Sequence, residues 1–91
     1  MRFLICYDIA DDRRRGRMAA LLMDFGTRIQ ESVFVATLDE ELRDRMIERT
    51  RRVMDELEDS VHVFAICAGC ANRVLILGKG DLPTDQPFYI L

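Results

Sequence analysis

Asp8 is the residue whose type and position point most directly to chemistry. It follows Phe3 to Tyr7, an apolar run of strand length, so its carboxylate is expected at the end of a buried strand. Carboxylate oxygens are the ligands that Mg²⁺ prefers, and the ion keeps several waters. One carboxylate is a poor metal site, but a two-fold axis near this strand end would bring two copies of Asp8 together. The alternative is that Asp8 only caps a turn before a helix.

Arginines cluster a few residues after this strand. Of the 13 basic residues, 12 are Arg, and four of them are Arg13, Arg14, Arg15 and Arg17. Guanidinium groups bind phosphates in bidentate geometry. At helical spacing Arg14 and Arg17 project together, as do Arg13 and Arg17, whereas Arg15 lies apart. The sequence therefore predicts phosphate contact by part of the cluster, and the alternative is a solvated face that pairs with nearby aspartates.

The cysteines allow three interpretations. Cys67 and Cys70 have C-x-x-C spacing, which serves thiol redox chemistry or half of a zinc site. Zinc would need more ligands, for example from the same motif of a second subunit, so a structural turn is the favoured interpretation. Three cysteines without an export signal favour free thiols in a reducing compartment. The only histidine, His62, receives no catalytic role.

Length and composition limit the class of protein. A chain of 91 residues with 49% hydrophobic residues forms one folded domain. No apolar run approaches the roughly 20 residues of a membrane-spanning helix, and no signal peptide is evident, so we expect a cytoplasmic protein without a membrane partner. The net charge of −3 argues against a general polyanion binder, although the acids concentrate in residues 39–59 and leave room for a basic patch. Because a small core without disulfides gains from a second subunit, we expect a homodimer.

The first half of the chain predicts a strand, a helix and then further strand. Residues 12–25 have helical apolar spacing, with Asp11 or Asp12 as N-cap and Gly26 as the residue after the helix. Residues 28–37 are predicted as either one bent strand or two short strands.

The second half predicts an amphipathic helix followed by strands. The helix is expected over residues 39–58, with a capping box formed by Thr37 and Glu40. Strands are expected at 61–66 and 74–77, joined by a turn, and residues 88–91 form an apolar C-terminus.

This order of elements predicts a fold class. It is that of a ferredoxin-like α+β sandwich, βαββαβ, with an extra C-terminal strand. Residues 1–78 would form the domain, and residues 79–91 a tail or strand that packs on the partner subunit.

Three segments carry a resemblance to a known family. They are FLICYDIADDRRRGR at residues 3–17, FGTRIQESVF at 25–34 and DSVHVFAICAGC at 59–70. In this order they resemble the Cas2 family, small CRISPR-associated proteins of spacer acquisition. Glu31 departs from the family, because many members carry an aromatic residue there, and this charge together with the low pI of 5.1 weakens the expectation of strong nucleic-acid binding.

The resemblance implies a ferredoxin-like homodimer in which the two copies of Asp8 face each other and hold Mg²⁺ or Mn²⁺. Some members are described as metal-dependent endonucleases on RNA or DNA. The family also partners the CRISPR integrase Cas1 and bridges its dimers across DNA. The functional positions of the family correspond here to Tyr7, Asp8, Arg15, Arg17, Arg28 and Phe34.

Three functions follow as hypotheses. In the first, the homodimer binds nucleic acid and cleaves phosphodiesters, with Asp8 as the catalytic and metal-binding residue. The residues expected on the nucleic acid are Tyr7, Arg14, Arg15, Arg17, Arg28 and Phe34. In the second, the protein is a non-catalytic adaptor between integrase dimers. In the third, it is a toxin-like ribonuclease of similar fold.

Overall fold

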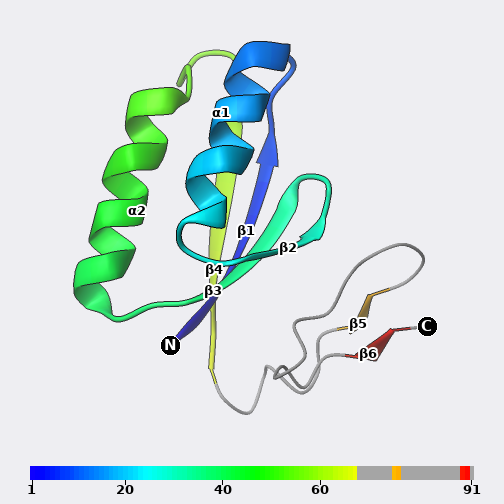
Figure 1. The fold of residues 1–91 in the computed structure, drawn as a ribbon, viewed down its shortest axis with the longest axis vertical. Helices are drawn as coiled ribbons and strands as arrows, with labels where there is room; N and C mark the ends of the chain where they lie inside the picture. Colours follow the sequence, from blue (N-terminus) through cyan, green and yellow to red (C-terminus); the bar gives the residue numbers. More distant parts are fainter. Residues whose placement is uncertain (68–74, 77–88, 91) are drawn as a thin grey trace.

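The computed structural model describes residues 1–67, 75–76 and 89–90, and it folds as a sheet with two helices on one face (Figure 1). The main elements are β1 (Arg2–Asp8), α1 (Asp12–Met23), β2 (Thr27–Gln30), β3 (Val33–Thr37), α2 (Glu40–Val53) and β4 (Ser60–Ile66). The strands lie in the order β2-β3-β1-β4, and each neighbouring pair is antiparallel. The predicted ferredoxin-like α+β fold is confirmed.

Strand β1 is central because it has apolar residues on both faces. Phe3, Ile5 and Tyr7 point to the helix side and join the main core, whereas Leu4 points to the other face and packs with Ile29 and Val35. Alternating side chains point to opposite faces of a strand, so a continuous apolar run is suited to a position between two layers.

The main core lies between the sheet and the helices. Met18 and Leu22 of α1, Met46 of α2 and Phe34 of β3 are almost completely buried there. These residues fix the sheet under both helices, which Figure 1 shows side by side over the same face.

Helix α1 begins as predicted and ends slightly earlier. The Asp11 side chain accepts a hydrogen bond from the Arg14 backbone N–H at 2.8 Å, which confirms Asp11 as the N-cap. The helix ends at Met23 instead of residue 25. Gly26 then lies against β3, where a Cβ would come within 2.2 Å of the Val35 carbonyl oxygen, so only glycine fits this close approach.

Residues 28–37 form two strands, which resolves the alternative that the sequence left open. Strands β2 and β3 pair as a hairpin, and the register shifts between Arg28 and Gln30, which marks a β-bulge.

Helix α2 corrects the sequence prediction at both ends. Its N-cap is Asp39, which accepts from the Leu42 backbone N–H, so the predicted capping box of Thr37 and Glu40 is wrong. The helix ends at Val53 instead of residue 58, because Met54 takes an extended conformation and residues 54–59 turn toward β4. The turn brings Asp59 to the side of α1.

Two short strands follow near the C-terminus. Strand β5 (Leu75–Ile76) pairs in parallel with β6 (Tyr89–Ile90). The predicted turn after Cys67 and the boundary between residues 78 and 79 lie outside the described residues. Packing of the tail on a partner subunit stays a prediction. No helix in the described part of the chain is long and apolar enough to cross a membrane.

Candidate functional site

Asp8 lies at the end of β1 with its side chain exposed. Its backbone is held in place on both sides, because Tyr7 and Ile9 are buried and Asp8 pairs with Ser60 of β4. The carboxylate is therefore presented to solvent from a fixed position, as the sequence predicted.

A cleft of about 410 Å³ opens beside this carboxylate. Asp8 and Arg15 line it together with Glu31 and Ser32, which form the turn between β2 and β3. A second cleft of about 460 Å³ shares Arg15 and Glu31 with the first and runs along α1, and Arg28 lines its other side. Arg15 thus lines both clefts, whereas Arg28 lines only the second.

The turn between β2 and β3 is held to β1 by converging hydrogen bonds. The Tyr7 hydroxyl donates to the Glu31 carbonyl oxygen at 3.1 Å, and the Tyr7 backbone N–H donates to the Ser32 carbonyl oxygen at 3.1 Å. Arg28 donates to the same Glu31 carbonyl from Nε at 3.0 Å and from Nη2 at 2.7 Å. Tyr7 and Arg28 therefore position the turn that forms one wall of the Asp8 cleft.

Phe34 packs against Tyr7 and Arg28, the two side chains that hold the turn between β2 and β3. Its side chain is 0% exposed, its ring lies 6.3 Å from the Tyr7 ring, and the Arg28 guanidinium lies 5.7 Å from its centroid. The structure places Phe34 in the core, where it positions Tyr7 and Arg28. Contact of these three residues with nucleic acid stays a prediction.

Arg14 forms a partly buried ion pair with Asp59. Its Nε and Nη2 donate to the two carboxylate oxygens of Asp59 at 2.8 and 3.1 Å, and the Asp59 side chain is 0% exposed. The hydrogen bond to Arg14, together with one from the Asp55 backbone N–H, holds the pKa of Asp59 below its usual value, and Asp59 raises the pKa of Arg14. A phosphate would have to compete with Asp59 for this guanidinium.

The other three arginines of the cluster divide into two kinds. Arg15 donates from Nη1 to the carbonyl oxygens of Ile9 and Ala10, both at 3.1 Å, and Nη2 pairs with Asp12, so Arg15 holds the β1–α1 connection. Arg13 and Arg17 are exposed, and within the described residues their side chains make no ion pair. These two are the guanidinium groups of α1 most open to a phosphate.

The donor set for a metal is small. In the described part of the chain, no three His, Cys, Asp or Glu side chains gather as a cation site. Asp8 is nevertheless an exposed hard oxygen donor, and Mg²⁺ is commonly held by one or two carboxylates plus waters. The chemistry of Asp8 fits such an ion when a second copy supplies another carboxylate.

The surroundings of the described cysteines and of His62 do not indicate a catalytic or metal-binding role. Burial raises the pKa of the Cys6 thiol, which disfavours the reactive thiolate, and Cys67 is exposed directly after β4. Cys70 lies outside the described residues. The exposed His62 ring packs edge-to-face with Phe64 at 6.2 Å.

Sequence reasoning missed one residue of this region, Asp59, whereas it had placed Glu31 and Ser32 near a possible polar groove. Glu31 and Ser32 line the Asp8 cleft, and Asp59 fixes Arg14. The polar triplet Gln30-Glu31-Ser32 between two apolar strands was the available signal for a turn. No local pattern connects Arg14 with Asp59, which lies 45 residues away.

Fold and site together define a class. The chain is a small ferredoxin-like α+β protein with an exposed aspartate at the end of its first strand, beside an arginine-rich first helix. The model of the family described as "CRISPR associated protein Cas2" matches residues 1–74. The chain belongs to the Cas2 family, which confirms the resemblance seen in the sequence.

Individual relatives agree with this assignment. The chain is 38% identical, over the full length of both chains, to the CRISPR-associated endoribonuclease Cas2 1 of Chloroflexus aurantiacus. It is 40% identical to the CRISPR-associated endonuclease Cas2 2 of Thermus thermophilus, covering 98% of this chain and 94% of the relative.

Solved structures show the same fold. A hypothetical protein from Thermus thermophilus has a TM-score of 0.79 at 38% identity, covering 90% of this chain and 95% of that one. Streptococcus pyogenes Cas2 at pH 6.5 also has a TM-score of 0.79, at 28% identity, covering 86% of this chain and all of that one.

Proposed function

We propose that this protein binds nucleic acid as a homodimer and cleaves phosphodiester bonds with the help of a divalent cation held by Asp8. The observation that carries the proposal is the exposed Asp8 carboxylate, fixed between buried Tyr7 and Ile9 at the mouth of a cleft that Arg15 lines. Two relatives are named as an endonuclease and an endoribonuclease, which supports the reaction class. The protein would act in CRISPR spacer acquisition.

A second copy of the chain is needed because one copy offers a single carboxylate at the cleft mouth. The sheet face opposite the helices supplies apolar surface for it: Leu4 pairs directly with Phe64, which is 51% exposed. Large exposed aromatic side chains on a sheet face favour association. A two-fold pairing would give a site with one Asp8 from each subunit.

Each residue has a separate task in this proposal. Mg²⁺ or Mn²⁺, when bound, would polarise the scissile phosphate. Asp8 of each subunit would hold the ion by hard oxygen ligands. Arg17 binds the nucleic-acid backbone, and Arg15 keeps the β1–α1 connection in place while its charge stabilises the phosphate. Tyr7 and Arg28 fix the cleft wall.

The test is cleavage of labelled single-stranded RNA and duplex DNA with Mg²⁺ by the wild type and by Asp8→Asn. We expect loss of cleavage by roughly a hundredfold or more, since loss of several kcal/mol of charge stabilisation corresponds to that factor. Thermal melting should be unchanged, because Asp8 is exposed. Equal cleavage by both proteins would show a contaminating nuclease and contradict the proposal.

A second candidate is the non-catalytic adaptor, a rigid spacer between dimers of the integrase Cas1. The exposed Arg13 and Arg17 favour it, because they lie four residues apart on α1 and can bind phosphates without any cleavage. Arg13→Ala/Arg17→Ala should abolish a salt-dependent shift of duplex DNA that Asp8→Asn leaves intact. The matched control, Arg43→Ala/Arg51→Ala, removes the same charge from α2 and should leave the shift in place.

A further inference from the structure

The charge of the Asp8 cleft is opposite to the charge that a phosphate backbone needs. This cleft and the second cleft, with which it shares Arg15, are lined by three carboxylates and by only two guanidinium groups. The carboxylates belong to Asp8, Asp12 and Glu31, and the guanidinium groups belong to Arg15 and Arg28. Nucleic acid that enters the cleft therefore meets an excess of negative charge.

The carboxylates of Asp8 and Glu31 are the source of this excess. Asp12 is matched by its ion pair with Arg15. In the described part of the chain, neither Asp8 nor Glu31 has a basic side chain as an ion-pair partner, and both residues are exposed. Two unmatched negative charges therefore line one cleft of about 410 Å³.

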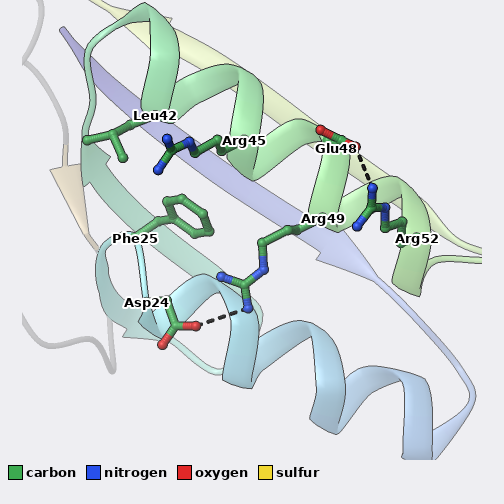
Figure 2. A pocket seen from close by; sticks show the side chains of 7 residues that line it. All are labelled: Asp24, Phe25, Leu42, Arg45, Glu48, Arg49 and Arg52. Carbon is green, nitrogen blue, oxygen red and sulfur yellow. Dashed lines mark hydrogen bonds and ion pairs between the residues drawn. The ribbon is translucent and has the colours of Figure 1, made fainter.

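The groove of about 400 Å³ between the end of α1 and helix α2 has a different balance of charge (Figure 2). Each of the three arginines that line it is paired with a carboxylate. The pairs join Arg45 to Glu41, Arg49 to Asp24 and Arg52 to Glu48. Unmatched charge thus distinguishes the Asp8 cleft from this other polar groove of the molecule.

The backbone of Glu31 is held at the wall of the Asp8 cleft. Its carbonyl oxygen accepts hydrogen bonds from the Tyr7 hydroxyl at 3.1 Å and from Nε and Nη2 of Arg28 at 3.0 and 2.7 Å. The neighbouring Ser32 carbonyl accepts from the Tyr7 backbone N–H. The turn that carries Glu31 cannot move away from the cleft without breaking these bonds, so the negative charge of Glu31 stays beside Asp8.

We infer that Glu31 makes the entry of nucleic acid into the Asp8 cleft depend on prior binding of a divalent cation. The inference rests on the proposed function for the identity of the ligand and adds the order in which cation and nucleic acid bind. Without a cation, the unmatched carboxylates of Asp8 and Glu31 repel a phosphate. A divalent cation supplies two positive charges, which offset both carboxylates, and the phosphate backbone can then enter. Glu31 acts here through its charge and need not be a metal ligand.

The substitution Glu31→Gln separates this role from a structural one. The hydrogen bonds that hold the turn use the backbone carbonyl of Glu31, which glutamine retains. The variant therefore removes the charge and keeps the turn, and its thermal melting should equal that of the wild type. The matched control is Glu56→Gln, which removes the same charge from an exposed residue of the α2–β4 turn that lines neither cleft.

The experiment measures the Kd of fluorescein-labelled single-stranded RNA and duplex DNA by fluorescence anisotropy, once in EDTA and once in Ca²⁺. Calcium takes oxygen ligands, as Mg²⁺ does, and a gel checks that the nucleic acid stays intact. We expect Ca²⁺ to tighten binding by the wild type roughly tenfold for at least one of the two ligands. In EDTA, Glu31→Gln should bind that ligand roughly fivefold more tightly than the wild type and should gain only about twofold from Ca²⁺. The control should stay within about twofold of the wild type in both conditions.

Two results would overturn the inference. One is an affinity in EDTA that Glu31→Gln leaves unchanged, and the other is an equal gain in Glu31→Gln and Glu56→Gln, which would show an effect of net charge alone. Failure of the proposed cleavage is a separate outcome, because the readout here is binding. If the wild type cleaves and Glu31→Gln binds no more tightly in EDTA, only the inference on Glu31 fails. If no protein cleaves and the specific effect of Glu31→Gln persists, only the proposed nuclease fails.

Discussion

The two sides of the N-terminal part of α1 carry the same residue type in different surroundings. On the side that faces the α2–β4 turn, Arg14 is held by the fully buried Asp59. On the solvent side, Arg13 and Arg17 are exposed near the Asp8 end of β1. The difference teaches that one arginine cluster can serve two purposes. A guanidinium that pairs with a buried carboxylate stabilises the fold, whereas an exposed guanidinium without such a partner remains available to a ligand.

The same distinction between internally bonded and exposed side chains applies to four other positions for which the resemblance to the family implies a function. Tyr7, Arg28 and Phe34 form an internally bonded cluster that holds the β2–β3 turn, and Asp8 alone projects into solvent at the cleft mouth. The predictions below test this division between positioning residues and exposed residues.

The largest expected effect is that of Phe34→Ala. The side chain is completely buried, so its removal should cost about 3–5 kcal/mol of unfolding free energy and release the Tyr7 and Arg28 contacts. Urea denaturation measures the loss. Leu57→Ala, at a side chain that is 96% exposed, should change stability by less than about 0.5 kcal/mol. A similar small effect at Phe34 would show that it is not part of the core.

Two glycines of the α1 region provide the next contrast. Gly26→Ala would place a Cβ within 2.2 Å of the Val35 carbonyl oxygen and should destabilise the fold by about 1–3 kcal/mol. Gly16→Ala, in the middle of α1 with nothing within 4 Å of the new Cβ, should stabilise it by roughly 0.5–1 kcal/mol. Thermal melting of the two variants compares them, and stabilisation by Gly26→Ala would contradict the close approach.

The Arg14–Asp59 pair predicts a pH dependence of stability. The pKa of Asp59 is lowered on folding, so its contribution is present above the unfolded value of 3.8 and is lost as the pH falls through the lower folded value. Asp59→Asn should melt at a lower temperature than the wild type at pH 7, and the gap should narrow below pH 3.8. A gap that is constant down to acid pH would contradict the role of the ionised pair.

The smallest expected effect on stability is that of Arg17→Ala. This change should leave the melting temperature unchanged and reduce the salt dependence of DNA binding by about one unit of slope, because one phosphate contact is lost. Arg14→Ala should behave in the opposite way and lower the melting temperature, since it leaves Asp59 buried without its partner. If Arg14→Ala weakened DNA binding without any loss of stability, the result would contradict the assignment of Arg14 to the fold and of Arg17 to the ligand.

Local patterns in the sequence were sufficient for most of the fold. The apolar run before Asp8, the Asp11 cap and the polar break between β2 and β3 each act over a few residues, and the structure follows them. They also placed Asp8 correctly at the end of a strand.

The remaining features depend on contacts between distant residues. Helix α2 ends at Val53 although the apolar spacing continues, because residues 54–59 turn to bring Asp59 under Arg14, 45 positions away. The pinning of Glu31 by Tyr7 depends likewise on strands β1 and β3 being neighbours. Periodicity reports which face a residue occupies, and it carries no information on these partners.

The most direct test of the central proposal is the binding of Mn²⁺ to the purified protein, followed by electron paramagnetic resonance alongside the oligomeric state. A cation shared by Asp8 of two subunits predicts a dimer that binds one Mn²⁺ for every two chains, with the binding lost in Asp8→Asn while the dimer persists. A monomer, or Mn²⁺ binding that Asp8→Asn leaves unchanged, would contradict the proposal.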